Sequence, residues 1–344
     1  MIEETTASLD RLELEAVPRC PVCASPKRLP LYEGLRDTLF GAPGLWALVR
    51  CAGCGAAYLD PRPTEKTIAA AYRSYYTHEE VPSFAPPPES STLVGKLKAA
   101  LRRGYLVERY GFPLDSGLPV ARWLVPLVFP RHRVAFDWSV RNLELPRVGA
   151  RLLDVGCGSG AFLTQAASLG WQAEGQEVDC AASVQARARG FKITEGPLES
   201  GAFPVGSFDA ITMAHVVEHL HRPGETLARA RQLLTPGGRL WMATPNLESP
   251  LHRRMGSSWR GLEPPRHVVL FTRRSLTRLL KESGFTRLRW VTPYPSTRWM
   301  HRAGVAAAGR GPACSERELV MLEAEALLVR SRGEELAVVA EKSP

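Results

Sequence analysis

The sequence predicts an α/β fold, in which a parallel sheet carries helices on both faces, preceded by a small cysteine-rich unit. Two observations support this prediction. From Arg151 onward, short apolar strands alternate with helical patterns, which is typical of βαβ units around a parallel sheet. Ahead of them, four cysteines stand in two C-x2-C pairs, a spacing typical of structural zinc sites.

Composition and charge agree with a globular protein of two domains. The chain has 344 residues, of which 44% are hydrophobic and 23% charged, as in ordinary soluble proteins. The net charge of +9 would suit an anionic partner, but the basic residues are scattered, which favours an arginine-rich solvated surface. We find no signal-peptide pattern and no apolar stretch long enough to cross a membrane, so we expect a cytoplasmic protein.

The first element is a zinc ribbon with the pattern C-x2-C-x27-C-x2-C, formed by Cys20, Cys23, Cys51 and Cys54. Four thiolates can surround zinc tetrahedrally, and such a closed site holds a fold without performing chemistry. A redox C-x2-C motif is the alternative, but two pairs without a surrounding βαβ pattern make it the weaker one. With a helix that starts near Thr64, the ribbon is expected to occupy residues 1–76.

Residues 77–130 are expected to form a linker and a helical lid. Residues 78–92 are rich in proline and polar residues, which is typical of a linker. Apolar residues at helical spacing then predict an amphipathic, basic helix over residues 94–109, followed by an apolar run at 118–129. This region is either a lid on the following domain or an interfacial patch for a lipid-linked substrate, with peripheral membrane contact through residues 94–129. We favour the lid.

Residues 151–163, RLLDVGCGSGAFL, predict a buried strand that runs through Gly156, Gly158 and Gly160 into a helix. A strand, a glycine turn and a helix N-terminus form a nucleotide pocket, because glycine lets backbone N–H groups approach a ligand closely. The spacing also satisfies the dinucleotide fingerprint, with Ala161 in the third position. Asp154 favours a cofactor with an ammonium group, since a carboxylate there would repel a pyrophosphate.

The sequence DVGCGSG resembles motif I of the class I S-adenosylmethionine-dependent methyltransferases, and the resemblance continues through most of residues 150–344. A bacterial family of these enzymes also carries four cysteines ahead of the catalytic domain. The resemblance implies a Rossmann-like, seven-stranded sheet over residues 131–344, S-adenosylmethionine as cofactor and methyltransferase activity. It assigns the methionine moiety to Asp154 and the three glycines.

For the nucleoside part of the cofactor, the sequence offers candidates on the next two predicted strands. Glu177 ends a predicted strand at 171–178 and is expected to hold the ribose hydroxyls, with Asp179 in reserve. Pro197 stands where related enzymes often have a polar residue that contacts the adenine. Adenine binding is therefore expected to use the Leu198 backbone and apolar packing.

The acceptor side is predicted from two further segments. After the strand in 208–223, His215, Glu218 and His219 stand at i, i+3 and i+4, where they could supply a general base, bind a divalent metal or only hold the loop. In a later proline-stiffened loop, Arg266 could bind an anionic acceptor and His267 could act as a base or donor. Scaffolding of the loop is the alternative for both.

These expectations favour a methyltransferase that acts on an oxygen or carbon of a small or lipid-linked metabolite, with compounds related to sugars or polysaccharides among the candidate acceptors. An RNA methyltransferase is an alternative in which the ribbon and the basic helix bind phosphates. Few aromatic residues accompany the basic ones, so a nucleic-acid partner is disfavoured. A non-catalytic S-adenosylmethionine-binding protein is the third alternative, and the dense polar cluster at 215–219 argues against it.

Overall fold

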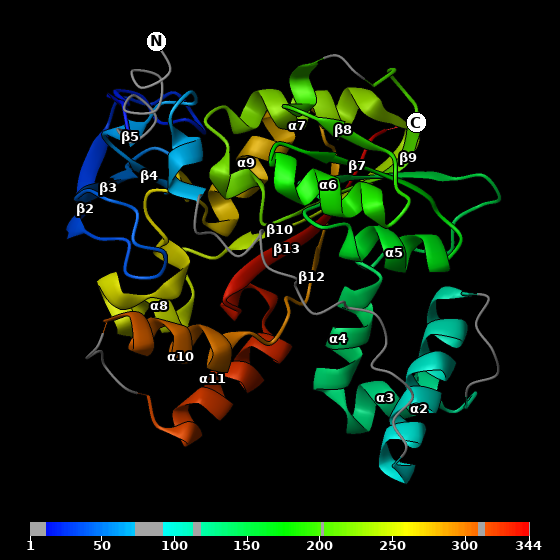
Figure 1. The fold of residues 1–344 in the computed structure, drawn as a ribbon. Helices are drawn as coiled ribbons and strands as arrows, with labels where there is room; N and C mark the ends of the chain where they lie inside the picture. Colours follow the sequence, from blue (N-terminus) through cyan, green and yellow to red (C-terminus); the bar gives the residue numbers. More distant parts are fainter. Residues whose placement is uncertain (1–11, 73–91, 113–117, 201–202, 309–313, 344) are drawn as a thin grey trace.

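A seven-stranded mixed sheet forms the centre of the structure, in the strand order β12-β13-β10-β9-β6-β7-β8 (Figure 1). The computed structural model describes residues 12–72, 92–112, 118–200, 203–308 and 314–343. The strands of the sheet are β6 (Arg151–Val155), β7 (Gln172–Glu177), β8 (Ile193–Glu195), β9 (Phe208–Ala214), β10 (Leu234–Pro245), β12 (Arg287–Val291) and β13 (Glu335–Glu341). The predicted seven-stranded fold is confirmed, with one difference in strand direction, since β13 runs antiparallel to both of its neighbours.

Helices cover both faces of this sheet because successive residues of each strand point to opposite sides. On one face, Leu153 and Val155 belong to the same apolar cluster as Leu227 and Leu276 of the covering helices. On the other face, Leu152 packs in a second cluster with Ala166. Leu227 belongs to α7 (Pro223–Leu233), Leu276 to α9 (Arg273–Glu282) and Ala166 to α5 (Ala161–Ser168). A fourth helix, α6 (Cys180–Ala188), follows β7.

The cysteine-bearing unit forms a second sheet, in the order β11-β4-β3-β2. Its strands are β2 (Arg28–Leu35), β3 (Trp46–Cys51), β4 (Ala57–Leu59) and β11 (Val269–Leu270), and a separate ribbon pairs β1 (Leu14–Glu15) with β5 (Arg62–Pro63). β11 comes from the last third of the chain and pairs with β4 through Val269 and Tyr58. The sheet of the N-terminal unit is thus completed by a strand from the part of the chain that forms the large sheet, and the division at residue 76 stays a prediction.

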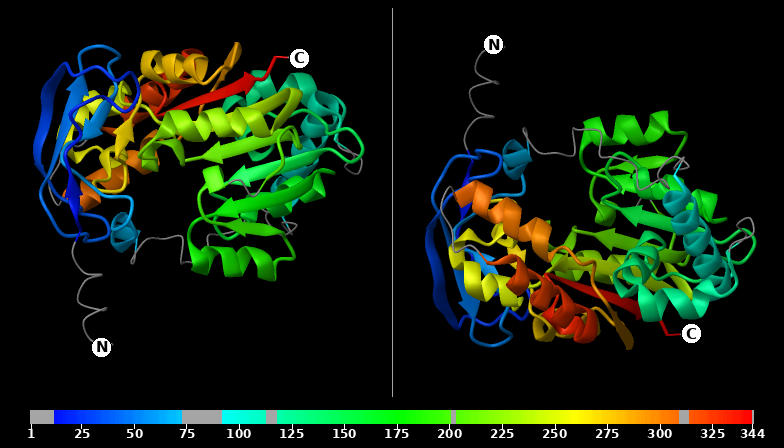
Figure 2. Two further views of the ribbon diagram at one scale, coloured as in Figure 1. Left: turned by 90° about the horizontal axis from the view of Figure 1, so that it is seen from above. Right: turned by 90° about the horizontal axis from the view of Figure 1, so that it is seen from below.

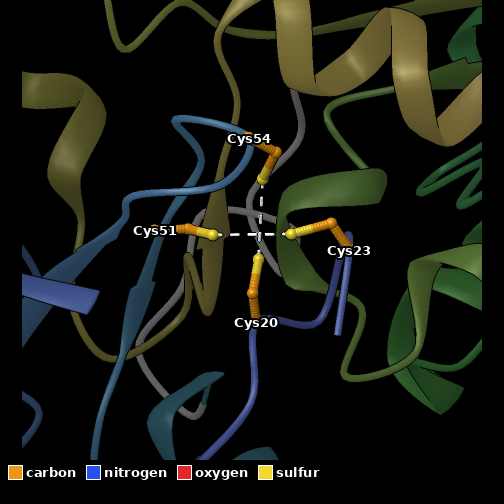
Figure 3. A group of neighbouring side chains, drawn as sticks. All are labelled: Cys20, Cys23, Cys51 and Cys54. Carbon is orange, nitrogen blue, oxygen red and sulfur yellow. Dashed lines mark hydrogen bonds between the residues drawn. The ribbon is translucent and has the colours of Figure 1, made fainter. Parts of the chain in front are cut away.

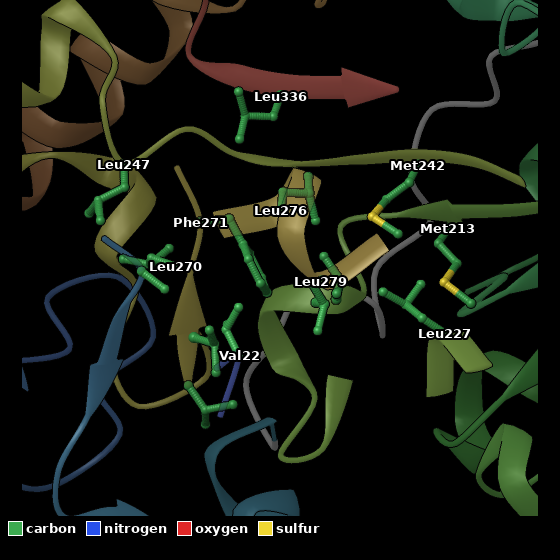
Figure 4. Close-up of a cluster of buried hydrophobic side chains, with 14 of the residues drawn as sticks. Val22, Met213, Leu227, Met242, Leu247, Leu270, Phe271, Leu276, Leu279 and Leu336 are labelled. Atoms are coloured by element: carbon green, nitrogen blue, oxygen red, sulfur yellow. The ribbon is translucent and has the colours of Figure 1, made fainter. Parts of the chain in front are cut away.

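The apolar core is continuous between the two sheets. Figure 4 shows Val22 of the cysteine unit in the same cluster as Leu270, Phe271 and Leu336. Since one core serves both sheets, the cysteine unit is fixed against the large sheet. The predicted helix from Thr64 is short: η1, a 3-10 helix, covers Ile68–Tyr72, and residues 73–76 lie outside the described part of the chain.

Three helices precede the large sheet: α2 (Leu93–Tyr110), α3 (Ala121–Val128) and α4 (Pro130–Ser139). They lie at the opposite end of the molecule from the cysteine-bearing sheet (Figures 1 and 2). Their buried side chains, among them Leu101, Tyr105 and Val125, pack with Leu169 beside the start of β7. Nearly all of the predicted linker, 78–91, lies outside the described residues. None of the helices that the structure describes has the length and apolar character needed to cross a bilayer.

A helical layer covers the loop that follows β10. It consists of α8 (Pro250–Met255), the short helices η5 (Gly256–Ser258) and η6 (Arg260–Leu262), α10 (Thr297–Ala308) and α11 (Glu316–Leu328). Ser315 caps α11 by accepting a hydrogen bond from the backbone of Glu318. α10 packs against α8, η5, η6 and α11 within this layer.

Candidate active site

The glycine loop after β6 has a backbone that only glycine adopts without strain. Gly156, Gly158 and Gly160 have φ angles of 65°, 54° and 82°. A Cβ atom at Gly156 would lie 2.7 Å from Cγ2 of Val216, whereas a Cβ at Gly158 would meet no atom within 4 Å. The loop therefore packs closely on one side and leaves open space at Gly158, where a ligand can approach the backbone.

Glu177 lies against this loop. One of its carboxylate oxygens accepts a hydrogen bond from the backbone N–H of Gly158 at 2.8 Å, and the other accepts from Val178 and Asp179 at 2.8 and 3.0 Å. Burial raises the pKa of Glu177, although these N–H groups oppose the shift. Asp179 instead caps the N-terminus of α6, because its carboxylate accepts a hydrogen bond from the backbone N–H of Ala182 at 3.0 Å. The geometry places Glu177 nearer to the loop's backbone than its reserve candidate.

Leu198 lies on the neighbouring strand connection. Gly196, two residues earlier, donates its backbone N–H to the carbonyl oxygen of Glu177 at 3.0 Å, and Leu198 is buried at the start of the short helix η3 (Leu198–Ser200). A Cβ atom at Gly196 would meet nothing within 4 Å, as at Gly158. Open backbone therefore occurs on both sides of Glu177, and the residues present fit a nucleoside cofactor there.

Asp154 is buried, and one oxygen of its carboxylate already has protein partners. Its Oδ1 accepts a hydrogen bond from the Thr212 hydroxyl at 2.7 Å and one from the guanidinium of Arg141, which forms an ion pair with it. Arg141 in turn lies 3.5 Å above the ring of Phe162. The sequence reasoning missed Arg141 and Thr212, because no local pattern links them to Asp154.

His215 comes directly after β9 in a left-handed conformation, with φ of 54°. Its Nδ1 lies 3.2 Å from Oε1 of Glu218, and its Nε2 lies 3.4 Å from Oε1 of Glu335. The side chain of His215 is 41% exposed, and its contacts with the two carboxylates outweigh desolvation and raise its pKa well above the usual value. An imidazole can donate from both nitrogens only when it is protonated, so this geometry favours the cation. Sequence reasoning did not identify Glu335.

Glu218 connects His215 to two further histidines. Its other oxygen accepts a hydrogen bond from Thr244 at 2.8 Å, and the hydrogen bond from His215 overcomes burial to lower the pKa of Glu218 to about 2. One ligand atom each of Glu218, His219 and His267 lies within 4.8 Å of the others. The structure thus brings His267, from a loop 48 residues later in the chain, to the predicted cluster at 215–219.

Backbone carbonyls orient both of these histidines. Nδ1 of His219 lies 3.0 Å from the carbonyl oxygen of Arg266 and 2.9 Å from the hydroxyl of Tyr72, and Nδ1 of His267 lies 2.8 Å from the carbonyl oxygen of Gly261. A carbonyl oxygen only accepts, so each Nδ1 carries the proton and each Nε2 keeps its lone pair in the neutral ring. Burial lowers the pKa of His267 to about 4, which keeps it neutral at pH 7.

Arg266 is completely buried in an ion-pair network between the two sheets. Its guanidinium lies 2.9 Å from Asp37 and 3.1 Å from Glu263, and it donates to the carbonyl oxygen of Ala71 at 2.8 Å. A cavity of about 250 Å³ between residues 33–39 and 257–264 adjoins this network. Because no solvent reaches Arg266, an anionic acceptor would need a rearrangement to contact it.

The four cysteines converge on one point (Figure 3). The Sγ atoms of Cys20 and Cys54 are 3.6 Å apart, and those of Cys23 and Cys51 are 3.5 Å apart. Zinc–sulfur bonds of about 2.3 Å in a tetrahedron would place the sulfurs about 3.8 Å apart, so the donor set and its spacing fit zinc. Gly55 and Ala24 take up equivalent left-handed positions after the two pairs.

Comparison with known proteins agrees with this architecture. Residues 130–289 match the family described as a methyltransferase domain. The chain is 26% identical over 191 residues to a ubiquinone biosynthesis O-methyltransferase of Aromatoleum aromaticum, covering 52% of this chain and 74% of that protein. It is 32% identical over 120 residues to the enzyme of that name from Xanthomonas oryzae, covering 33% and 49%. The chain thus spans about half the length of several such relatives.

Among solved structures, an S-adenosylmethionine-dependent methyltransferase from Mesorhizobium loti superimposes with a TM-score of 0.40 at 22% identity, covering 60% of this chain and 97% of that one. The matched domain covers all five parallel strands from β6 to β10, including the glycine loop and the polar cluster after β9. Residues 130–289 of the chain therefore form a methyltransferase domain, which is built on the parallel strands of this sheet.

Proposed function

We propose that the chain transfers a methyl group from S-adenosylmethionine to an oxygen of a small, lipid-linked acceptor. One observation carries the proposal: the polar cluster of His215, Glu218 and His219 follows β9, which pairs directly with the strand that carries the glycine loop. Donor and acceptor sites would therefore adjoin at one edge of the sheet. The names of the relatives favour oxygen over carbon and a lipid-linked acceptor over a free sugar.

On the donor side, we assign roles to the residues around the open backbone at Gly158 and Gly196. S-adenosylmethionine, when bound, supplies an electrophilic methyl group on a sulfonium. Gly156, Gly158 and Gly160 would let the backbone approach the cofactor, Glu177 would bind the ribose, and Leu198 would pack beside the adenine. For Asp154, the oxygen that is not shared with Arg141 and Thr212 remains the proposed contact. Alignment and exclusion of water would supply much of the acceleration.

On the acceptor side, the charge states divide the histidines into two kinds. The cationic His215 would donate hydrogen bonds and could not accept a proton. His219 is half-buried, and its Nε2 makes none of the backbone contacts that Nδ1 makes, so it is the better proposed base. His267 lies 3.8 Å from Glu263 through Nε2 and would position the acceptor.

Binding of a divalent cation is a second proposed use of Glu218, His219 and His267. Two imidazole nitrogens and the carboxylate of Glu218 form a donor set that suits a divalent metal, and histidine ligands commonly donate their other N–H to a carbonyl oxygen. Titration calorimetry with Mg²⁺, Mn²⁺ and Zn²⁺ tests this use, with Glu218→Gln as the variant and Glu195→Gln as the control. Equal metal binding by all three proteins would contradict it.

The cysteine cluster is proposed to hold a structural zinc ion, because its four sulfurs leave no coordination position for a substrate. Free thiolate ligands persist in a reducing compartment, so we propose a cytoplasmic location.

The methyl acceptor class can be tested with S-adenosylmethionine that carries a labelled methyl group. The purified chain is incubated with a lipid extract, with total RNA or with water-soluble metabolites. We expect label in the organic phase only. Label in RNA would support the RNA alternative instead, and calorimetry that shows binding of NAD but not of S-adenosylmethionine would overturn the donor assignment.

A further inference from the structure

The helical hairpin of α2 and α3 exposes an unusual amount of apolar surface. Leu93 and Leu127 are 86% and 81% exposed, and Trp123 is 68% exposed. Val94, Leu97 and Val128 are also more than half exposed. The two helices pack together, with the backbone N–H of Leu118 donating to the carbonyl oxygen of Ala100, so these six residues belong to one hairpin and are called the hairpin surface below.

The fold does not use the hairpin surface. The buried side of the same helices is made by other residues, including Leu101, Tyr105 and Val125, which are at most 7% exposed. Each helix therefore already has its own packed face. Single exposed apolar residues are ordinary, but six of them on two helices that pack together indicate an interaction site.

The charge around the hairpin surface selects the kind of partner. Residues 93–134 contain eight lysines and arginines and only two acidic residues. Lys96, Lys98 and Arg122 are exposed beside the apolar residues. A second copy of this chain would bring the same positive charge against itself, whereas an anionic surface would be attracted.

We propose that the hairpin surface docks on the anionic surface of a lipid bilayer. Exposed leucine and tryptophan side chains, flanked by lysine and arginine, are the features that hold an amphipathic segment in the interfacial plane of a membrane. The guanidinium of Arg122 lies 5.3 Å from the ring of Trp123, which joins a cation to an interfacial aromatic ring. α3 has only eight residues, with Pro126 among them, so it lies on the bilayer and does not cross it.

Docking here would also place the catalytic domain at the membrane. α4 continues from α3 and ends at Ser139, two residues before Arg141, which pairs with Asp154 beside the glycine loop. The hairpin surface is therefore joined by one short helix to the proposed donor site. This inference goes beyond the methyl-transfer proposal and does not depend on it, because a membrane contact can be measured without an acceptor.

The experiment is vesicle co-sedimentation of the full chain. Vesicles of phosphatidylcholine alone are compared with vesicles that also contain phosphatidylglycerol, at low and high salt. We expect binding only to the anionic vesicles, and weaker binding at high salt. Trp123→Ser with Leu127→Ser, and separately Lys96→Glu with Lys98→Glu, should each lower the affinity about tenfold or more.

The control replaces exposed apolar residues at another site, Met321→Ser with Leu328→Ser on α11, and it should bind as the unchanged protein does. Circular dichroism of each variant verifies its fold. Absence of binding to anionic vesicles, or equal loss in the control, would overturn the proposal. So would dimers in sedimentation velocity that Leu127→Ser dissociates, because the hairpin surface would then bind a second copy.

Discussion

Replacing Asp154 by alanine should destabilise the catalytic domain, in addition to any effect on the cofactor. The side chains of Asp154 and Arg141 are 2% and 11% exposed, so the substitution leaves a buried guanidinium without its carboxylate. Removing one partner of a buried pair costs about 3–5 kcal/mol. That loss is a large part of the 5–15 kcal/mol that is typical of a folded protein. Thr212 would also lose the acceptor of its hydroxyl hydrogen bond.

Urea unfolding followed by circular dichroism measures this loss, with two controls. Glu195→Ala breaks the exposed pair with Arg187 and should cost no more than about 1 kcal/mol. The double variant Arg141→Met, Asp154→Leu removes both charges and should recover most of the stability lost in Asp154→Ala, because apolar residues of similar volume can replace a buried pair.

The result that would refute this reasoning is a loss below about 1 kcal/mol in Asp154→Ala, since the charge of Arg141 would then be compensated in some other way. Calorimetry with S-adenosylmethionine must be done where the variant is still folded. Under those conditions Asp154→Asn, which keeps the shape of the side chain, separates a contact with the cofactor from a loss of fold.

Three further predictions concern the proposed zinc site, the buried carboxyl group of Glu334 and the charge of His215. Cys51→Ser should release zinc and destabilise the cysteine-bearing sheet, and metal analysis that finds stoichiometric zinc in the variant would contradict the ligand assignment. Burial raises the pKa of Glu334 to about 7, so ionisation of this carboxyl group lowers the free energy of unfolding as the pH rises from about 4.5 to 7. Glu334→Gln should therefore be about 3 kcal/mol more stable than the unchanged protein at about pH 8. Thermal unfolding should show little difference between the two proteins at about pH 4. His215→Ala should lower kcat more than it raises KM. Because the pKa of His215 lies well above its usual value, the difference in rate between the unchanged protein and the variant should persist through about pH 7 and shrink at higher pH, whereas a difference that grows with pH through the neutral range would identify His215 as the base.

The parts of the fold that were predictable are those written in local sequence patterns. The strand, the three glycines and the helix at 151–163 follow one another in the sequence, and the two cysteine pairs have a spacing that is itself the signal. A seven-stranded sheet followed from the resemblance that these motifs carry. The apolar run at 118–129 also predicted α3 approximately, because its length and its proline limit the helix.

The contacts that were not predictable join residues far apart in the chain. Asp37 and Arg266 are 229 residues apart, and Glu335 reaches His215 only because β13 inserts next to β10 in the reverse direction. β11 has two residues, which is too short for any periodicity to reveal. Such contacts depend on how the elements pack, so the sequence could identify His215 and Arg266 as notable without showing their partners.

The position of β11 gives the cysteine unit a role in the catalytic domain. β11 pairs with β4 directly after the loop that carries Arg266 and His267, and Arg266 binds Asp37 of the cysteine unit. Tyr72 of the same unit contacts His219. The N-terminal unit therefore packs against the loops that carry His219 and His267, which we propose to lie on the acceptor side. A metal that holds the four cysteines would stabilise the loop of His267 as well. For this reason, removal of zinc from the proposed structural site should weaken methyl transfer.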